Sequence, residues 1–247
     1  MSKPPLSVVI PAFNEGGNIG RLVRETVDKL GNAVALDIIV IDDESDDDTA
    51  QELAALKDVG ELRVIRHPKR SGKSAALRTG ALAARADWIA TMDGDAQNDP
   101  ADILNMVREI DLTRVGAVGL VAGIRRKRND GESRKMASRF ANGLRQRLLR
   151  DDCPDTGCGL KLLPRDVFLA MPFFDALHRY IPAFARHLGF EVRYVSVDDR
   201  PRESGVSKYS NFGRAVAGLF DLAGVVWLMR RGSVPSKDLL FRHDDEA

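Results

Sequence analysis

Residues 88–97 are Trp-Ile-Ala-Thr-Met-Asp-Gly-Asp-Ala-Gln, an apolar run that ends abruptly in two carboxylates and an amide. The apolar part has the length and character of a strand buried on both faces. Asp93 and Asp95 flank a glycine that permits close backbone approach, so both can turn toward one hard divalent cation, with the Gln97 amide oxygen as a further ligand. An isolated Asp-Gly-Asp is more often a turn, but directly after a buried strand the pattern favours a metal site.

Outward from this stretch, short β-branched runs alternate with helix-length amphipathic runs. Similar strand-like runs occupy 6–10, 37–41, 62–65 and 117–122, and candidate helices occupy 18–30, 47–56, 74–86 and 101–110. This rhythm is typical of a parallel sheet covered by helices, with connections long enough for crossovers between parallel strands. We therefore predict an α/β fold with a mostly parallel sheet.

The composition limits the possible classes of protein. The chain has 247 residues, 44% of them hydrophobic and 30% charged, as expected of a soluble domain that buries a real core. The 37 basic and 36 acidic residues give a net charge of +1, which argues against a general nucleic-acid binder. Cys153 and Cys158 have neither disulfide-framework nor zinc-site spacing, so a reducing cytoplasmic setting is expected. The sequence shows no signal peptide and no apolar stretch of the roughly 18 residues that a spanning helix needs.

Acidic residues and turn formers gather where the predicted strands end, which is where ligands bind in open parallel sheets. Residues 11–15 follow the first strand, and six of the seven residues in 42–48 are acidic. Residues 46–48 suit a helix N-terminus, whose dipole favours negative charge. Asp42 and Asp43 come earlier, at the strand end, where such a charge density must face cations, hydrogen-bond donors or solvent.

Two nucleotide-binding motifs are incomplete. Residues 71–74 end like a P-loop, but His67 occupies the place of its first glycine. Gly17 and Gly20 match the end of G-x-G-x-x-G, but Glu15 occupies the first glycine position. Neither an ATPase nor a dinucleotide-dependent enzyme is supported.

The second half of the chain has one strong charge asymmetry and one long apolar run. Residues 125–150 contain ten basic and two acidic residues. The run 212–229 contains Arg214 and Asp221, and charges at the centre of a bilayer are costly. We therefore expect a helix that lies on a membrane surface or packs on the domain.

Five motifs in order resemble those of the family 2 glycosyltransferases, and within them the polyprenyl-phosphate sugar synthases typified by dolichol-phosphate mannosyltransferase. The motifs lie at 8–15, 41–49, 72–73, 92–97 and 202–209, so that the resemblance covers most of the chain. It implies a GT-A type catalytic domain over 1–209, a nucleotide-binding, mostly parallel sheet flanked by helices. An amphipathic helix at 210–231, possible on a membrane surface, and a polar mobile tail at 232–247 would follow.

The resemblance also implies the residues of the donor site. A nucleotide-sugar would be held by Pro11, Phe13, Glu15, Asp42, Asp43, Lys73, Asp93 and Gly94. Phe13 stands where the family usually has Tyr, which keeps the aromatic contact but lacks the hydroxyl. Mg²⁺ or Mn²⁺ would be bound by Asp93, Asp95 and Gln97 and would neutralise charge on the departing diphosphate.

On the acceptor side, the resemblance implies a phosphate site formed by Arg125, Arg139, Arg202 and Lys208. Guanidinium and ammonium groups suit a phosphate monoester. Arg134 is an alternative to Arg139 on the same basic segment. Catalysis is expected to depend on Asp95, Arg202 and Lys208.

The implied reaction is metal-dependent, inverting transfer of a sugar from a GDP- or UDP-sugar to a polyprenyl phosphate of the dolichyl or undecaprenyl type. A phosphate monoester has a second pKa near about 6, so it is largely dianionic at neutral pH and needs no dedicated catalytic base. Relatives commonly carry membrane-spanning helices, so association with a membrane is expected. For this sequence, we expect peripheral attachment on the cytoplasmic face. A membrane-protein partner that supplies such helices stays open.

Two alternatives remain at this point. A family 2 transferase acting on a sugar or protein hydroxyl would need a general base, for which Asp155 is the candidate. A non-catalytic nucleotide-sugar-binding module is the other, although the complete set of Asp93, Asp95 and Gln97 argues against it.

Overall fold

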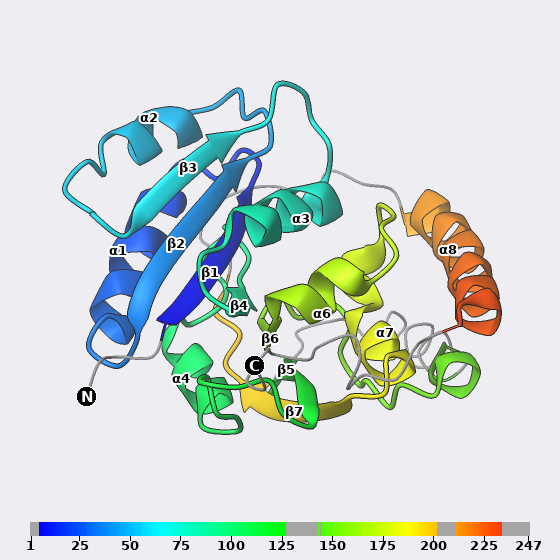
Figure 1. Ribbon diagram of the computed structural model, residues 1–247. Coiled ribbons are helices and arrows are strands. Elements are labelled where there is room, and N and C mark those ends of the chain that lie inside the picture. The colour runs from blue at the N-terminus through cyan, green and yellow to red at the C-terminus, as the bar shows by residue number, and fades with distance from the viewer. Residues whose placement is uncertain (1–4, 127–142, 144, 202–210, 234–247) are drawn as a thin grey trace.

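The computed structural model describes residues 5–126, 143, 145–201 and 211–233, and the side chains of 211–216 are not described. A seven-stranded sheet has the order β3-β2-β1-β4-β6-β5-β7, with helices on both faces (Figure 1). The strands are β1 (Pro5–Ala12), β2 (Ala35–Asp42), β3 (Leu62–Arg66), β4 (Trp88–Thr91), β5 (Val118–Arg125), β6 (Lys161–Pro164) and β7 (Glu191–Val197). The helices are α1 (Ile19–Leu30), α2 (Thr49–Ala54), α3 (Lys73–Ala83), α4 (Ala101–Val107), α6 (Arg165–Ala170), α7 (Ile181–His187) and α8 (Asn211–Arg231), with a 3-10 turn η1 (Leu177–Arg179).

The first four strands are parallel, as the alternation of strands and helices predicts. Successive side chains of a strand point to opposite faces of the sheet, and β1 shows this clearly. Val8 and Ile10 join the apolar cluster under α1, α2 and α4, whereas Val9 joins the cluster under α3, α6 and α7. Since both faces of β1 are buried, its sequence is continuously apolar.

The second half departs from the parallel pattern at one strand. β6 runs antiparallel to both of its neighbours, β4 and β5, while β5 and β7 pair in parallel. The prediction of a mostly parallel sheet is confirmed, with β6 as the exception. The start of β6 thereby meets the sheet edge at which β1 and β4 end.

Several elements differ in extent from the sequence-based expectation, with local causes. The helix expected at 47–56 begins only at Thr49, because the Asp47 carboxylate accepts hydrogen bonds from the Thr49 amide and hydroxyl. The helix expected at 74–86 ends at Ala83, because the amides of Arg85 and Ala86 turn away to bond the Ser7 hydroxyl.

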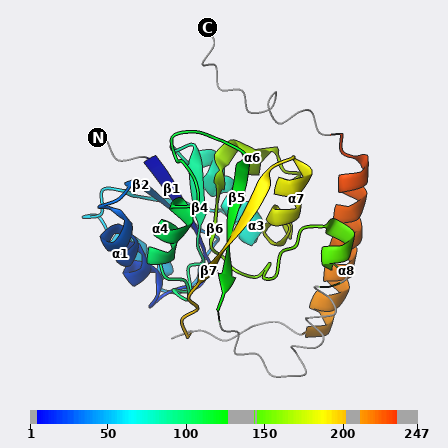
Figure 2. The same cartoon turned by 90° about the horizontal axis from the view of Figure 1, so that it is seen from below.

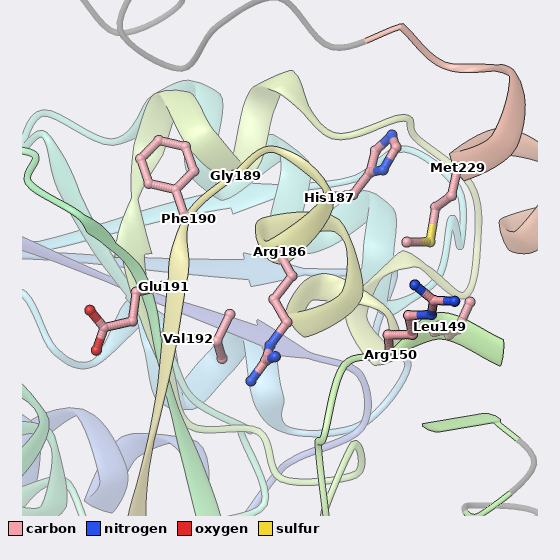
Figure 3. A pocket seen from close by; sticks show the side chains of 9 residues that line it. All are labelled: Leu149, Arg150, Arg186, His187, Gly189, Phe190, Glu191, Val192 and Met229. Carbon is pink, nitrogen blue, oxygen red and sulfur yellow. The ribbon is translucent and has the colours of Figure 1, made fainter. Parts of the chain in front are cut away.

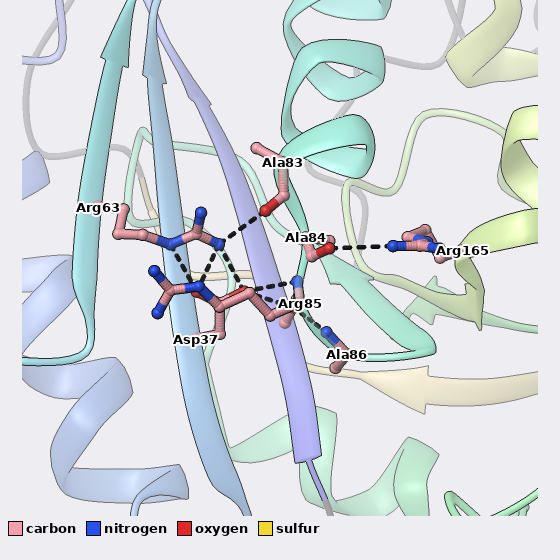
Figure 4. Close-up of polar contacts among 8 residues, drawn as sticks. Asp37, Arg63, Ala83, Ala84, Arg85, Ala86 and Arg165 are labelled. Carbon is pink, nitrogen blue, oxygen red and sulfur yellow. Dashed lines mark hydrogen bonds and ion pairs between the residues drawn. The ribbon is translucent and has the colours of Figure 1, made fainter.

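That turn after α3 belongs to a polar network at the opposite end of the strands (Figure 4). The Asp37 carboxylate accepts from Arg63 at 2.6 and 2.8 Å, from the Ser7 hydroxyl at 2.7 Å and from the Arg85 amide at 3.0 Å. Arg63 also donates to the Ala83 carbonyl at 2.8 Å. Asp37 is buried, and these donors satisfy the hydrogen-bonding capacity of its carboxylate. The network therefore connects β1, β2 and β3 to the end of α3.

Helix α8 packs on the domain beside α7 (Figure 2). Leu222 and Val225 are buried in the second apolar cluster, whereas Phe220 and Trp227, on the other side, are 75% and 62% exposed, and Leu219 is 60% exposed. Its described side chains are therefore apolar on both faces, less one-sided than the expected amphipathic helix. In the part of the chain that the structure describes, no helix is long and apolar enough to cross a membrane.

Candidate active site

A cavity of about 420 Å³ opens at the carboxyl ends of β1, β2 and β4. Ligands of open α/β sheets bind at this edge. Its lining combines residues at and after the ends of β1, β2, β3 and β4 with the beginning of α3 and with His178: Pro11, Ala12, Phe13, Glu15, Asp43, Arg70, Gly72, Lys73, Ala76, Asp93, Gly94, Asp95 and His178. The structure thus brings together seven of the eight residues expected at the donor site. Asp42 is the exception.

The loops after β1, β2 and β4 share a strained conformation. Asn14, Glu44 and Ala96 have φ values of 56°, 67° and 56°, in the left-handed region that non-glycine residues rarely adopt. The loops after β1 and β2 are hydrogen-bonded to each other. The side-chain amide oxygen of Asn14 accepts from the backbone amide of Asp46 at 3.0 Å, and the backbone amide of Asn14 donates to the Ser45 hydroxyl at 3.0 Å. Such strain persists only where the surroundings hold it in place, and it clusters at ligand sites.

Asp42 and Asp43 have different surroundings. The Asp42 carboxylate is buried and accepts from Arg66 at 2.9 Å and from the Ser45 amide at 2.9 Å. It does not line the cavity, and its expected contact with the donor stays a prediction without support from the lining. Asp43 lines the cavity and accepts from His67 at 2.7 Å and from the amides of residues 71 and 72 at 2.8 and 2.7 Å.

Asp43 therefore organises the loop that leads into α3. Gly72 closes this loop with a φ of 87°, a conformation that favours glycine. The next residue, Lys73, begins the helix, and its ammonium pairs with the Asp93 carboxylate. A chain of contacts thus links the end of β2, the start of α3 and the end of β4.

Asp93 lies against the backbone of the 151–160 loop. A Cβ atom added at Gly159 would lie 2.5 Å from the Asp93 carboxyl carbon, and the Thr91 hydroxyl donates to the Gly159 carbonyl at 2.7 Å. Burial favours the neutral form of Asp93, but the Lys73 ammonium, with help from Lys161, outweighs burial and holds the pKa of Asp93 below its usual range. The carboxylate is therefore ionised at neutral pH.

Buried Lys161 and partly buried His178 lie near Asp93 together with Lys73. Burial, together with the charge of Lys73, lowers the pKa of Lys161, whose ammonium donates to the Cys158 carbonyl. Burial is also the largest cause that lowers the pKa of His178 to about 3, followed by the charges of Lys73 and Lys161. His178 is therefore neutral at physiological pH.

Asp93, Asp95 and Gln97 have the chemistry of a site for a hard divalent cation, because all three offer oxygen atoms. Both carboxylates line the cavity, whereas Gln97 is not in its lining, and the Gln97 side-chain amide nitrogen donates to the Arg200 carbonyl at 3.2 Å. The residues thus fit the expected metal. No cluster of three or more His, Cys, Asp or Glu side chains is found among the described residues, so this candidate site consists of two carboxylates and one amide.

Phe13 and Arg70 form one wall of the cavity. The Arg70 guanidinium lies 3.8 Å from the centre of the Phe13 ring, a cation–π contact. Also in the lining, the Pro11 carbonyl and the Glu15 side chain lie 3.0 and 3.3 Å from the position that a Cβ on Gly94 would take. Residue 94 must therefore be small for these two loops to meet.

Arg125 does not line the cavity but pairs with Asp155. The Asp155 carboxylate accepts from Arg125 Nε at 2.7 Å and from Nη2 at 2.9 Å, and these bonds raise the pKa of Arg125 above its usual value. Its expected contact with an acceptor phosphate stays a prediction. The other residues expected there, Arg139, Arg202 and Lys208, lie outside the described residues.

Arg200, two residues before Arg202, was not singled out by sequence reasoning. Its guanidinium pairs with Glu25 at 2.7 Å and Asp99 at 2.6 Å, and its amide donates to the Gln97 carbonyl at 2.9 Å. The chain entering the 202–209 motif is thereby fixed beside the 93–97 motif.

Sequence reasoning also missed Arg70, Ser74, Lys161 and His178 as members of this region. Arg70 and Ser74 flank the Gly72-Lys73 motif, and that proximity was the only signal for them. Ser74 and His178 are in contact across 104 residues of sequence, and no spacing rule predicts such a pair.

A second cavity of about 490 Å³ lies apart from this site, between α7, β7 and α8 (Figure 3). Its lining includes Arg150, Arg186, His187 and Met229. Arg186 is already paired with Asp152 at 3.0 Å. None of the residues expected at the donor or metal site lies in its lining.

The sequence of most of this chain is similar to that of known proteins. The family model described as glycosyl transferase family 2 matches residues 7–170. The dodecaprenyl-phosphate galacturonate synthase of Rhizobium johnstonii is 35% identical over 238 residues, covering 93% of this chain and 69% of that protein. The undecaprenyl-phosphate 4-deoxy-4-formamido-L-arabinose transferase of Pseudomonas fluorescens is 32% identical, covering 88% of this chain and 63% of that protein. The chain thus spans about two thirds of the length of these relatives.

Solved structures support the same architecture. Glucosyl-3-phosphoglycerate synthase from Mycobacterium tuberculosis, in complex with Mn²⁺, UDP and glucosyl-3-phosphoglycerate, superposes with a TM-score of 0.69 at 21% identity. The match covers 94% of this chain and 81% of that one. At this identity the likeness shows a common fold.

Proposed function

Because this chain belongs to glycosyl transferase family 2, we propose that it transfers a sugar from a nucleoside-diphosphate sugar to a polyprenyl phosphate. The fold is of the GT-A type. The observation that carries the proposal is that seven of the eight residues expected at the donor site line one cavity, with both Asp93 and Asp95 among them. The polyprenyl phosphate acceptor is proposed from the names of the two relatives.

In this proposal different residues of the cavity bind different parts of the nucleotide-sugar donor. Phe13 and Arg70 offer flat surfaces on which a nucleobase can stack, and the carboxylates beyond them suit a metal-bound diphosphate. Asp93, Asp95 and Gln97 would hold Mg²⁺ or Mn²⁺, which stabilises negative charge on the leaving diphosphate. Lys73 adds a positive charge at the same place.

Two candidate bases, one in the cavity lining and one outside it, are poorly suited to activate a hydroxyl acceptor. His178, with a pKa of about 3, is a weak base, and the Asp155 carboxylate is occupied by Arg125 on both oxygens. An acceptor that already carries a negative charge needs no base. This supports a phosphate acceptor over a sugar or protein hydroxyl, with the phosphate oxygen attacking the anomeric carbon in line and with inversion.

We further propose peripheral contact with the membrane that contains the acceptor, on its cytoplasmic face, through the outer side of α8. Leu219, Phe220 and Trp227 are exposed there, and Arg230 and Arg231 end the helix. Apolar side chains at the headgroup boundary and basic residues near anionic lipid both favour such binding.

The test is release of nucleoside diphosphate from GDP- and UDP-sugars with Mg²⁺ or Mn²⁺, with and without a short polyprenyl phosphate. We expect release that requires the lipid phosphate and is lost in Asp95→Ala. Asp58→Ala, which changes an exposed aspartate outside the cavity lining, is the matched control and should keep wild-type turnover. Donor binding without release from any pair would favour the non-catalytic module, and release that requires a hydroxyl acceptor would favour the other alternative.

A further inference from the structure

His178 reaches the cavity from a distant part of the chain. It belongs to the 3-10 turn η1, which the fold places against the start of α3, and it lines the cavity together with Lys73 and Asp93. The mechanism proposed above does not use this side chain. Its hydrogen bonds, however, determine what its ring can offer to a ligand.

Those hydrogen bonds fix the tautomer of the His178 ring. The Ser74 hydroxyl lies 2.5 Å from the Asp175 carbonyl oxygen, and two oxygens can be this close only with a proton between them. Ser74 has a single hydroxyl proton, so its oxygen must accept at its contact with His178 Nδ1, which is 2.8 Å away. Nδ1 therefore carries the ring proton.

The remaining ring nitrogen is a bare acceptor. A neutral imidazole has one proton, and with that proton on Nδ1 the lone pair of Nε2 is free to accept. Nδ1 is turned toward Ser74, which does not line the cavity. Because His178 does line the cavity, the opposite edge of its ring faces the cavity. Among the described residues, no hydrogen bond to Nε2 is found.

The acceptor character of Nε2 restricts its partner. A phosphate oxygen of the donor has no proton to donate at neutral pH, so it would face the lone pair unfavourably. The hydroxyl groups of a sugar, or the N–H of an acylamino sugar, are the donors that a nucleotide-sugar offers near its diphosphate. His178 lines the cavity together with Lys73 and Asp93, where the proposal above puts the diphosphate of the donor.

We propose that His178 determines donor specificity by accepting a hydrogen bond at Nε2 from a hydroxyl or N–H group of the donor sugar. Ser74 is a positioning residue, because it holds the ring in the tautomer that this bond requires. The inference rests on the proposed use of a nucleotide-sugar, but not on the nature of the acceptor. A polar group in a site that lacks its partner is strongly disfavoured, so sugars without the matching group should be rejected.

The test compares binding of the nucleotide-sugar with binding of the nucleoside diphosphate alone, by calorimetry in the presence of the metal. In His178→Phe we expect affinity for the nucleotide-sugar to fall about tenfold, the effect of one hydrogen bond of about 1.4 kcal/mol, with unchanged affinity for the diphosphate. His178→Gln, whose amide oxygen can accept, should recover part of the loss. His187→Phe, which removes a histidine from the second cavity, is the matched control and should bind both ligands like wild type.

Deoxy analogues of the donor identify the bonded group. One analogue should bind wild type and His178→Phe equally, while the others keep the tenfold difference. Nitrogen NMR of the wild-type ring should show a protonated Nδ1 and a bare Nε2, and Ser74→Ala should change this pattern.

If His178→Phe lost affinity for the nucleotide-sugar and for the diphosphate equally, His178 would have a structural role and the inference would be overturned. If the variant had a changed affinity for Mn²⁺ alone, His178 would be a metal ligand, which would also overturn it. Equal affinities of His178→Phe and wild type for the nucleotide-sugar would also overturn it. A wild-type protein that binds the nucleotide-sugar but does not react with polyprenyl phosphate would refute the proposed function and leave this inference standing.

Discussion

Replacing Gly159 by alanine tests the arrangement of the metal site directly. The added Cβ would lie 2.5–2.7 Å from the carboxyl atoms of Asp93, whereas ordinary contacts begin near 3.4 Å. Asp93 or the 151–160 backbone must therefore move by roughly 0.7–0.9 Å, the difference between these distances. A misplacement of about 1 Å at a reacting site can cost about 100-fold in rate.

We expect kcat/KM of Gly159→Ala for nucleoside diphosphate release to fall about 100-fold, with weaker binding of the donor and metal. The assay is steady-state release with the preferred donor, together with calorimetric donor affinity and the thermal unfolding midpoint. Gly116→Ala, whose Cβ would meet nothing within 4 Å, should behave like wild type.

Gly119→Ala supplies the second control, because its Cβ would lie 2.4 Å from Phe190, outside the candidate active site. It should lower the unfolding midpoint while the folded fraction keeps its kcat/KM. If Gly159→Ala kept more than half of the wild-type kcat/KM with an unchanged midpoint, the reasoning about Asp93 would be refuted.

Four further predictions address separate features. Asp37→Asn should lower the free energy of unfolding in urea by about 3 kcal/mol, because it breaks a buried ion pair, with kcat/KM of the folded protein unchanged; unchanged stability would show that the Asp37 network contributes little. Asp155→Asn should leave donor affinity unchanged and reduce turnover less than about tenfold, since Asp155 is not expected to act as a base; a complete loss of turnover with intact donor binding would instead support a hydroxyl acceptor. Phe220→Ser with Trp227→Ser should reduce co-sedimentation with anionic vesicles without lowering turnover on a detergent-dissolved acceptor, and unchanged sedimentation would exclude this face of α8. Lys73→Met removes the cation that keeps the pKa of Asp93 low. In wild type this pair contributes stability that is present above about pH 4 and is lost as the pH falls through the folded pKa of Asp93, so the unfolding free energy of the variant should differ from that of wild type most at pH 7 and less below pH 4. A difference that does not depend on pH would contradict the role of this pair.

The parallel half of the fold could be predicted because its signals are local. Continuous apolar runs at β1, β2 and β4 reflect burial on both faces, and the acids that follow them mark the ligand edge. The gathering of Asp43, Asp93 and Asp95 around one cavity follows from that parallel order.

What escaped prediction depends on contacts between distant segments. Asp42 and Asp43 are neighbours with the same side chain, yet strand alternation turns one toward Arg66 and the other toward the cavity. His178 enters the site only because η1 packs on α3, and the antiparallel direction of β6 has no signature in its four residues.

The antiparallel course of β6 has a consequence for how this enzyme can change. Because β6 enters from the ligand edge, the 151–160 loop that precedes it lies against Asp93, and the Thr91 hydroxyl donates to the carbonyl of Gly159, two residues before the strand. A mutation that reshapes this loop will also disturb the carboxylate expected to bind the metal. Changes in this loop are therefore coupled to the metal site, and we expect laboratory evolution to accept substitutions more readily at residues outside it.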